Sequence, residues 1–306
     1  MNLPRCEVLP LPDHQASFRI EGAERLRWHF DPKYPRPFLY PLIGPSGSSL
    51  TRMGHPGAPN HDHHRSIWFA HEKALGINFW TDRPQAVAPF IRQKEWLCYQ
   101  DGEEQASMAV VLNWYDGHNP KELLEQELVV GVRPGLENET FVEIQASFKP
   151  VAETLEFGKT NFGFLAVRVA KNISEFFGGG AITNSEGATG EPAIFGKPAK
   201  WMDYSGPVAK EKSEGITYFD HPSNPGHPVK WHVREDGWMG ASACMDGPIT
   251  TTRKEPLTLR YLLHAHAGKI DGDRAGKILQ EFAETKGYVV SKATAKHTQF
   301  TIGRVR

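Results

Sequence analysis

The sequence predicts an all-β protein, an antiparallel two-sheet β-sandwich with one C-terminal helix. Three observations lead to this prediction. Several segments alternate apolar and polar residues with a period of two, which is typical of half-buried antiparallel strands. The 23 prolines and 29 glycines supply the many turns that all-β folds need. One segment near the C-terminus repeats its apolar residues with the period of an α-helix.

The strands are expected along most of the chain. Alternation is clearest in residues 141–148, where Val142 and Ile144 share one face and Glu143 and Gln145 the other. Residues 105–115 and 122–132 have the same pattern, and the turn 116–120 joins them. Residues 257–266 form a further strand, with Arg260 and His264 on one face. Shorter strands are predicted at residues 38–42, 67–70, 162–169, 202–205 and 216–219.

The helix is predicted over residues 273–286. Ala275, Ile278, Leu279 and Phe282 repeat at helical spacing, with Asp273 expected to cap the start. Gly287 is expected to end it. No internal repeat, low-complexity tract or change in composition marks a linker, so residues 1–306 are interpreted as a single β-sandwich domain.

Composition narrows the partners and the compartment. Lys and Arg total 35 against 36 Asp and Glu, and no long basic run occurs, so no nucleic-acid partner is expected. No stretch approaches the roughly 20 apolar residues of a membrane span, so no membrane partner is expected either. Three scattered cysteines and an N-terminus without an apolar signal core favour a cytoplasmic protein, with a removed signal peptide as the alternative.

Two long segments, 44–65 and 178–200, lack clear periodicity, and such loops are often functional. The first contains a histidine cluster that ends in Arg65. His61 and His63 can face the same way and could chelate one Zn²⁺-like ion, whereas His63 and His64 cannot both do so in an extended chain. Acid–base chemistry or substrate binding is an open alternative. Hydrogen bonding to the backbone of a proline-rich loop is the third interpretation.

Three further clusters are candidates for the site. Residues 220–234 form a proline-punctuated turn that could hold polar side chains rigidly, or serve only as a capped turn. Glu186 and Asp203 could be paired carboxylates, one acid and one base. Cationic and polar side chains on or near strands would suit an anionic or polyhydroxy ligand, or lie on a solvated face. The additional members of these clusters are Lys159, Arg168, Asn184, Trp201, Tyr204, His221, Asn224, His227, Trp231, His232, Arg234, Arg260, Tyr261 and His264.

Several common catalytic motifs are absent from the sequence. It has no G-x-S-x-G nucleophile elbow, no phosphate-binding loop and no glycine-rich dinucleotide motif. A serine hydrolase, a P-loop enzyme and a nicotinamide oxidoreductase are therefore not indicated.

These clusters resemble the bacterial PmoA-like family. The matching stretches are Arg36-Pro-Phe-Leu-Tyr-Pro-Leu42, His61-Asp-His-His-Arg-Ser-Ile-Trp-Phe69, Gly163-Phe-Leu-Ala-Val-Arg-Val169, Asn184-Ser-Glu-Gly187, Trp201-Met-Asp-Tyr-Ser-Gly206, Asp220-His-Pro-Ser-Asn-Pro-Gly-His-Pro228, Trp231-His-Val-Arg234 and Leu259-Arg-Tyr-Leu-Leu-His264. Many relatives have Pro in place of Asp62 and an acidic residue in place of Thr160. If Thr160 replaces a catalytic acid, the activity of this chain is in question.

The resemblance implies carbohydrate catabolism rather than methane oxidation. Particulate methane monooxygenase is an integral membrane enzyme, and this sequence has no spanning segment. The family's β-rich pattern is similar to the supersandwich of aldose mutarotases and several polysaccharide lyases. Together with the residue clusters, it implies an enzyme that acts on a sugar or keto-sugar derivative by hydrolysis, β-elimination or epimerisation.

Roles for individual residues complete the hypothesis. His63, His64 and His221 are the candidate bases or acids, Glu186 and Asp203 the candidate carboxylates. Arg168 and Lys159 would stabilise developing negative charge. The candidate substrate-binding residues are Arg65, Lys159, Arg168, Asn184, Trp201, Tyr204, Asn224, His227, Trp231, His232, Arg234 and His264. The alternative is a non-catalytic carbohydrate-binding or sensing module, in which Trp201 and Trp231 matter most. The sugar and the oligomeric state are not determined by the sequence.

Overall fold

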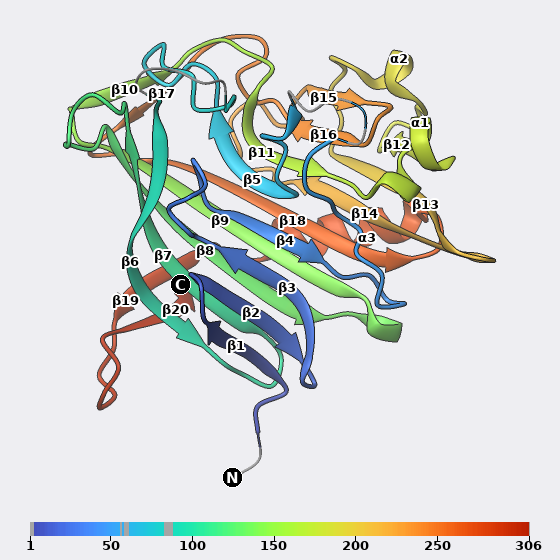
Figure 1. The fold of residues 1–306 in the computed structure, drawn as a ribbon, viewed down its shortest axis with the longest axis horizontal. Coiled ribbons are helices and arrows are strands. Elements are labelled where there is room, and N and C mark those ends of the chain that lie inside the picture. Colours follow the sequence, from blue (N-terminus) through green and yellow to red (C-terminus); the bar gives the residue numbers. More distant parts are fainter. Residues whose placement is uncertain (1–2, 56, 58–60, 83–87, 306) are drawn as a thin grey trace.

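The computed structural model describes residues 3–55, 57, 61–82 and 88–305. Two antiparallel sheets of eight strands each pack face to face, which confirms the predicted two-sheet β-sandwich (Figure 1). The first sheet runs in the order β1 (Cys6–Leu11), β2 (Gln15–Ile20), β3 (Ala23–His29), β4 (Phe38–Leu42), β5 (Ile67–His71), β11 (Gly163–Arg168), β16 (Trp238–Ala241) and β15 (Trp231–Arg234).

The second sheet contains the longest strands. Its order is β12 (Ala181–Asn184), β13 (Trp201–Ala209), β14 (Lys212–Asp220), β18 (Leu257–Ala267), β9 (Thr140–Pro150), β8 (Leu124–Pro134), β7 (Ala106–Tyr115) and β6 (Phe90–Gln100). Two small antiparallel pairs accompany the sheets: β10 (Thr154–Phe157) with β17 (Ile249–Thr252), and β19 (Tyr288–Lys292) with β20 (Phe300–Arg304). The strands predicted from alternation are all present, with ends shifted by a few residues.

Helices are few and short among the described residues. They are α1 (Glu175–Gly178), α2 (Glu191–Ile194), α3 (Gly272–Glu284) and the 3₁₀ turns η2 (Leu136–Asn138) and η3 (Lys171–Ile173). The predicted C-terminal helix is α3, but its cap is Asp271 rather than Asp273, because the Asp271 carboxylate accepts the backbone N–H groups of Asp273 and Arg274. None of the described helices has the length and apolar character that crossing a membrane would require.

The hydrophobic core lies between the two sheets and follows the predicted alternation. Val142 and Ile144 of β9 point into it, as expected. The opposite face of β9 was expected to be solvated, yet Glu143 and Gln145 are buried as well. The β19–β20 pair covers them, since Gln145 bonds the backbone of Tyr288, and Arg304 pairs with Glu143. Figure 1 shows this pair beside the second sheet.

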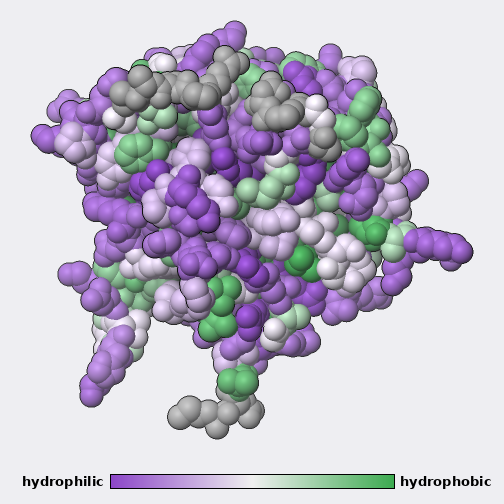
Figure 2. All heavy atoms as spheres, viewed as in Figure 1, coloured by the Kyte–Doolittle hydropathy of each residue, from purple (hydrophilic) through white to green (hydrophobic). Residues whose placement is uncertain are grey.

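Helix α3 covers another part of that outer face. Its residues Ala275, Ile278 and Phe282 form a buried cluster with Leu262 of β18 and with Trp201 of β13. The apolar face of the helix therefore replaces solvent over the second sheet. The outer face of the first sheet carries different residues, described below. On the molecular face drawn in Figure 2, hydrophobic side chains appear in small separate groups among hydrophilic ones.

Gly206 tests how tightly the edge of the second sheet is packed. A Cβ atom placed there would lie 2.7 Å from Ile173 Cα and 2.8 Å from Gly180 Cα, both backbone atoms. We expect Gly206→Ala to lower the free energy of unfolding by about 1–3 kcal/mol, because backbone cannot move aside as a flexible side chain can. Urea unfolding measures this. Gly247→Ala is the matched control, since a Cβ at Gly247 meets nothing within 4 Å; equal stability of the two variants would contradict the prediction.

Candidate functional site

Four neighbouring strands of the first sheet, β5, β11, β16 and β15, carry two different faces. Apolar residues such as Phe69, Val167 and Met239 point into the core shared with the second sheet. Their neighbours along the chain therefore point outward, because successive side chains of a strand alternate. Among these neighbours are Trp68 and Arg168. The outer face is thus built from aromatic and charged side chains.

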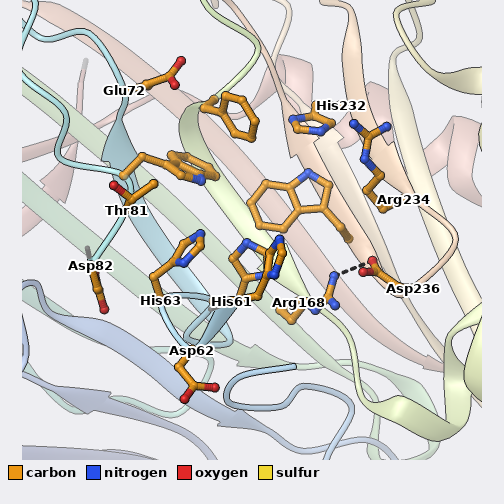
Figure 3. Close-up of a pocket in the computed structure, with 14 residues that line it drawn as sticks. His61, Asp62, His63, Glu72, Thr81, Asp82, Arg168, His232, Arg234 and Asp236 are labelled. Atoms are coloured by element: carbon orange, nitrogen blue, oxygen red, sulfur yellow. Dashed lines mark hydrogen bonds and ion pairs between the residues drawn. The ribbon is translucent and has the colours of Figure 1, made fainter. Parts of the chain in front are cut away.

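A pocket of about 600 Å³ lies on this outer face. That volume is within the range of small-molecule binding sites. Figure 3 shows the side chains that surround it. The residues that line it are His61, Asp62, His63, His64, Glu72, Trp80, Thr81, Asp82, Phe162, Arg168, His232, Arg234, Asp236 and Trp238.

Three tryptophans, Trp68, Trp80 and Trp238, form an aromatic floor. Their ring centroids are 5.3 Å apart for Trp68–Trp238 and Trp80–Trp238, and 5.7 Å apart for Trp68–Trp80. All three are nearly fully buried. Trp80 is positioned by Asn78, whose side-chain oxygen accepts the Trp80 backbone N–H. Trp80 and Trp238 line the pocket, and Trp68 packs against both of them.

The predicted histidine cluster lies beside this floor. Residues 61–64 form a turn rather than an extended chain, since the His64 N–H donates to the carbonyl of His61. All three imidazoles therefore reach the pocket, and the opposite orientation expected for His63 and His64 in an extended chain does not apply. The ring centroids of His63 and His64 are 4.3 Å apart, and His64 stacks at 5.6 Å on Trp68.

The arrangement does not favour the metal site that His61 and His63 suggested. Their rings stack 5.7 Å apart with an interplanar angle of 26°. Among the residues that the structure describes, no group of three or more His, Cys, Asp or Glu side chains is placed to hold an ion. The donor set for a zinc ion with nitrogen and oxygen ligands is therefore not assembled here. The chemistry below uses the side chains alone.

Arg168 and Asp236 form the main ion pair of the pocket. Arg168 is fully buried, and its Nη1 donates to Asp236 Oδ1 at 2.6 Å. His55 Nε2 donates to Asp236 Oδ2 at 2.8 Å. Burial alone would raise the pKa of Asp236, but the hydrogen bonds and charge of Arg168 and His55 outweigh it and lower the pKa. The buried guanidinium group of Arg168 is thus paired with a carboxylate.

A second carboxylate, Asp82, is held by two arginines. Arg36 Nη2 donates to Asp82 Oδ1 at 2.6 Å, and Arg65 forms an ion pair with Asp82 Oδ2. Arg36 also donates to the backbone carbonyls of Phe79 and Trp80. Burial lowers the pKa of Arg36 to about 10, which still leaves it charged at neutral pH. Arg65 therefore supports the wall of the pocket through Asp82.

The carboxylate of Glu72 is oriented by Thr160. The Thr160 hydroxyl donates to Glu72 Oε2 at 2.5 Å and accepts the Phe162 N–H at 3.1 Å. Glu72 lies at one end of the pocket, across from Arg168 (Figure 3). The resemblance implied an acidic residue in place of Thr160. Here the carboxylate of Glu72, which directly follows β5, lies beside Thr160.

His232 presents a neutral nitrogen. Its Nδ1 lies 3.2 Å from the carbonyl oxygen of Asn161, so Nδ1 carries the proton and Nε2 keeps its lone pair. Burial, followed by the charge of Arg234, lowers the pKa of His232 to about 4. Burial and nearby cationic groups also lower the pKa of His64. Both imidazoles are therefore uncharged at neutral pH.

The structure brings six of the sequence-predicted site residues into the lining: His61, His63, His64, Arg168, His232 and Arg234. Arg65 and Tyr204 act from behind it. The Tyr204 hydroxyl donates toward the carbonyls of Arg234 and Glu235, which supports the turn that carries Asp236. The six lining residues meet at one pocket although they are far apart in the sequence.

The other candidates lie outside this pocket. Asp203 is buried in the second sheet with His266, Ser205 and Thr217. Glu186 and Lys159 are exposed. Asn184 caps its own loop, Trp201 packs under α3, and His221 lies beside Arg260 and Phe282. Asn224 and His227 bind Asp220, and Trp231 donates to the Ala199 carbonyl. Tyr261 is in the core, and His264 binds Glu139.

Eight lining residues were not among the candidates from the sequence: Asp62, Glu72, Trp80, Thr81, Asp82, Phe162, Asp236 and Trp238. A signal for one of them exists in the sequence. Arg234 pairs with Trp238 across the β15–β16 turn, so both lie on the same face. Continuing the alternation of His232 and Arg234 through the turn at Gly237 would have placed Trp238 beside them. The others lie outside the strands, where alternation gives no phase.

The neutral state of His232 predicts acid sensitivity. Its folded pKa lies below the 6.5 of the unfolded chain, so protons bind the unfolded state first as the pH falls. This contribution to stability is present above pH 6.5, is lost as the pH falls toward 4, and is on the order of 3 kcal/mol. Urea unfolding at several pH values measures it. We expect His232→Gln to flatten the pH dependence; a profile as steep as that of the exposed-site control His118→Gln would contradict the prediction.

No functionally curated protein matches the sequence. Among solved structures, the chain is similar to "Putative kojibiose phosphorylase from human microbiome", with 8% identity, a TM-score of 0.33, and coverage of 93% of this chain but 37% of that one. So weak a likeness carries no argument about function. The family model described as "Family of unknown function (DUF6807)" matches residues 15–280, and the chain belongs to that family.

Proposed function

We propose that the protein is a carbohydrate-active enzyme that acts on a sugar or keto-sugar derivative by hydrolysis, β-elimination or epimerisation. The observation that carries the proposal is the pocket: an aromatic floor with carboxylates and imidazoles around it. The apolar face of a sugar ring can lie on Trp80 or Trp238, while its hydroxyl groups meet polar side chains. The resemblance to the PmoA-like family supports the same substrate class.

Each of the three reactions needs a base that takes a proton and an acid that delivers one. We assign proton transfer to His63 rather than His64, because the pKa of His64 is lowered so strongly that its imidazole is a weak base. Glu72 takes the carboxylate role that Glu186 and Asp203 had in the sequence hypothesis, since neither of those two lines the pocket. His221, also outside, has no role in this proposal.

The remaining polar residues bind the substrate. His232 Nε2 can accept a hydrogen bond from a sugar hydroxyl, because Nδ1 already donates to Asn161. Arg168 and Arg234 supply positive charge where oxygen becomes negative in the transition state. No step is routed through a metal ion. We propose one domain for residues 1–306, supported by a single hydrophobic cluster that includes both Cys6 and Ala265.

A non-catalytic carbohydrate-binding module is the second candidate, and the tryptophan floor favours it. Stacking on Trp80 and Trp238 could hold a sugar without any proton transfer. In this case, Trp80→Ala or Trp238→Ala would abolish binding, whereas changes at His63 or Glu72 would have little effect. Trp201 and Trp231, which pack under α3 and in the core, are not among the residues that line the pocket.

The test is turnover of a substrate panel by the protein and its variants. Glycosides, 3-keto-glycosides and free sugars are incubated with the protein and followed by NMR. We expect at least one to be converted, and expect His63→Gln and Glu72→Gln to lower kcat by about 100-fold or more with retained binding, because general acid–base groups contribute that much.

The matched control is Glu186→Gln, which removes an exposed carboxylate outside the pocket and should leave kcat unchanged. Binding without turnover on any member of the panel would reject the enzyme in favour of the binding module. Neither binding nor turnover would reject both.

A further inference from the structure

Several side chains that line the pocket have hydrogen-bond donors without partners among the described residues. Nε1 of Trp80 and of Trp238 has no hydrogen-bond partner among the described residues, and neither have Nε and Nη2 of Arg168. All three side chains line the pocket, and each is at most 2% exposed. A buried N–H group that loses water and gains no acceptor costs free energy. A ligand that supplies acceptor oxygens would recover it.

The unpaired edge of Arg168 has a specific shape. Asp236 uses only Nη1, at 2.6 Å. Nε and Nη2 lie on one edge of the planar guanidinium, where two parallel N–H groups can bind two oxygens side by side. A carboxylate has two such oxygens and no donor. A neutral sugar hydroxyl carries its own proton, which would need an acceptor in a place where donors predominate.

The charges around this edge are unequal. Asp236 receives Nη1 of Arg168 on its carboxylate and Nη2 of Arg52 on its backbone carbonyl, the latter at 3.0 Å. Two guanidinium groups therefore lie near Asp236, but only Arg168 pairs with its carboxylate. Asp82 faces both Arg36 and Arg65.

Other carboxylates of the lining lie farther from this edge. Glu72 is across the pocket from Arg168, and Asp62 points away from its centre (Figure 3). Arg234 is paired with Glu191. At His64, burial and then the charges of neighbouring imidazoles and of Arg168 and Arg52 all lower the pKa. At this edge, the two cations Arg168 and Arg52 therefore lie near one carboxylate, that of Asp236.

We propose that the substrate is an acidic sugar, and that its carboxylate binds the Nε/Nη2 edge of Arg168 with the neighbouring indole N–H groups of the floor. This inference rests on the proposed function. The sugar ring then extends over the tryptophans toward Glu72, so that the anionic group and the reacting bonds meet opposite ends of the pocket.

Matched pairs of sugars test the inference by isothermal titration calorimetry at constant ionic strength. Glucuronate is compared with glucose, and galacturonate with galactose, with glucose 6-phosphate as the tetrahedral anion. We expect each acid to bind at least tenfold more tightly than its neutral partner and more tightly than the phosphate. Arg168→Gln should remove this preference. Arg5→Gln, which removes an exposed arginine outside the pocket lining, should keep it.

A second variant guards against misfolding of Arg168→Gln, in which Asp236 would lose its main counter-charge. Trp238→Phe keeps an aromatic ring and removes one indole N–H, and it should reduce the preference for acids several-fold. Circular dichroism confirms the fold of each variant. If Arg168→Gln does not fold, the wild-type pairs and Trp238→Phe decide.

The contrary outcomes separate the inference from the proposed function. Neutral sugars that bind or react as well as the acids would overturn the inference and leave the proposed function standing. Tighter binding of the phosphate would overturn the carboxylate assignment. If folded Arg168→Gln still prefers the acids to the neutral sugars, the assignment of Arg168 as the carboxylate-binding residue is wrong. If no sugar of any kind binds, the proposed function fails and the inference fails with it.

Discussion

The ion pair between Arg168 and Asp236 is the interaction on which the rest of the pocket depends. Arg168 ends β11 and is fully buried, a position that a guanidinium tolerates only beside a carboxylate. Asp236 lies in the turn between β15 and β16, so the pair fixes this turn against the centre of the sheet. His55 also binds Asp236, and it belongs to the segment that precedes the histidine cluster. Through one carboxylate, the strand end, the turn that leads to Trp238 and the histidine segment are held together.

The two faces of the first sheet have different roles: the inner face packs in the core, and the pocket lies on the outer face. The inner face of β5, β11, β16 and β15 is apolar and belongs to the main core. The outer face does not contribute to the main core, and it carries the tryptophan floor, the histidines and the charged groups. Because both faces are set by the same strands, the packed core also fixes the positions of the outer side chains. Sites built on strands in this way keep their geometry better than sites built on loops.

The departure at Thr160 takes on a physical meaning in the folded chain. The PmoA-like resemblance implies an acidic residue at this position, and its replacement by threonine raised doubt about activity. The Thr160 hydroxyl donates to Glu72, so a carboxylate is present beside the position even though the chain supplies it from the end of β5. The hydroxyl group of Thr160 orients this carboxylate at one end of the pocket.

Local sequence patterns determined the sandwich, most of its strands and α3, because alternation and helical periodicity report which face of an element is buried. The histidine cluster and Arg168 were also found from residue type alone. The tertiary structure decided which clusters meet. His221, Asp203 and His264 looked equally suitable in the sequence, but their strands pair into the second sheet or its edge, where Phe282, His266 and Glu139 satisfy them. Glu72, Asp82 and Trp80 joined the pocket only because β5 is hydrogen-bonded to β11. Alternation along one strand defines a face, but strand order, which depends on contacts between distant segments, defines which faces adjoin.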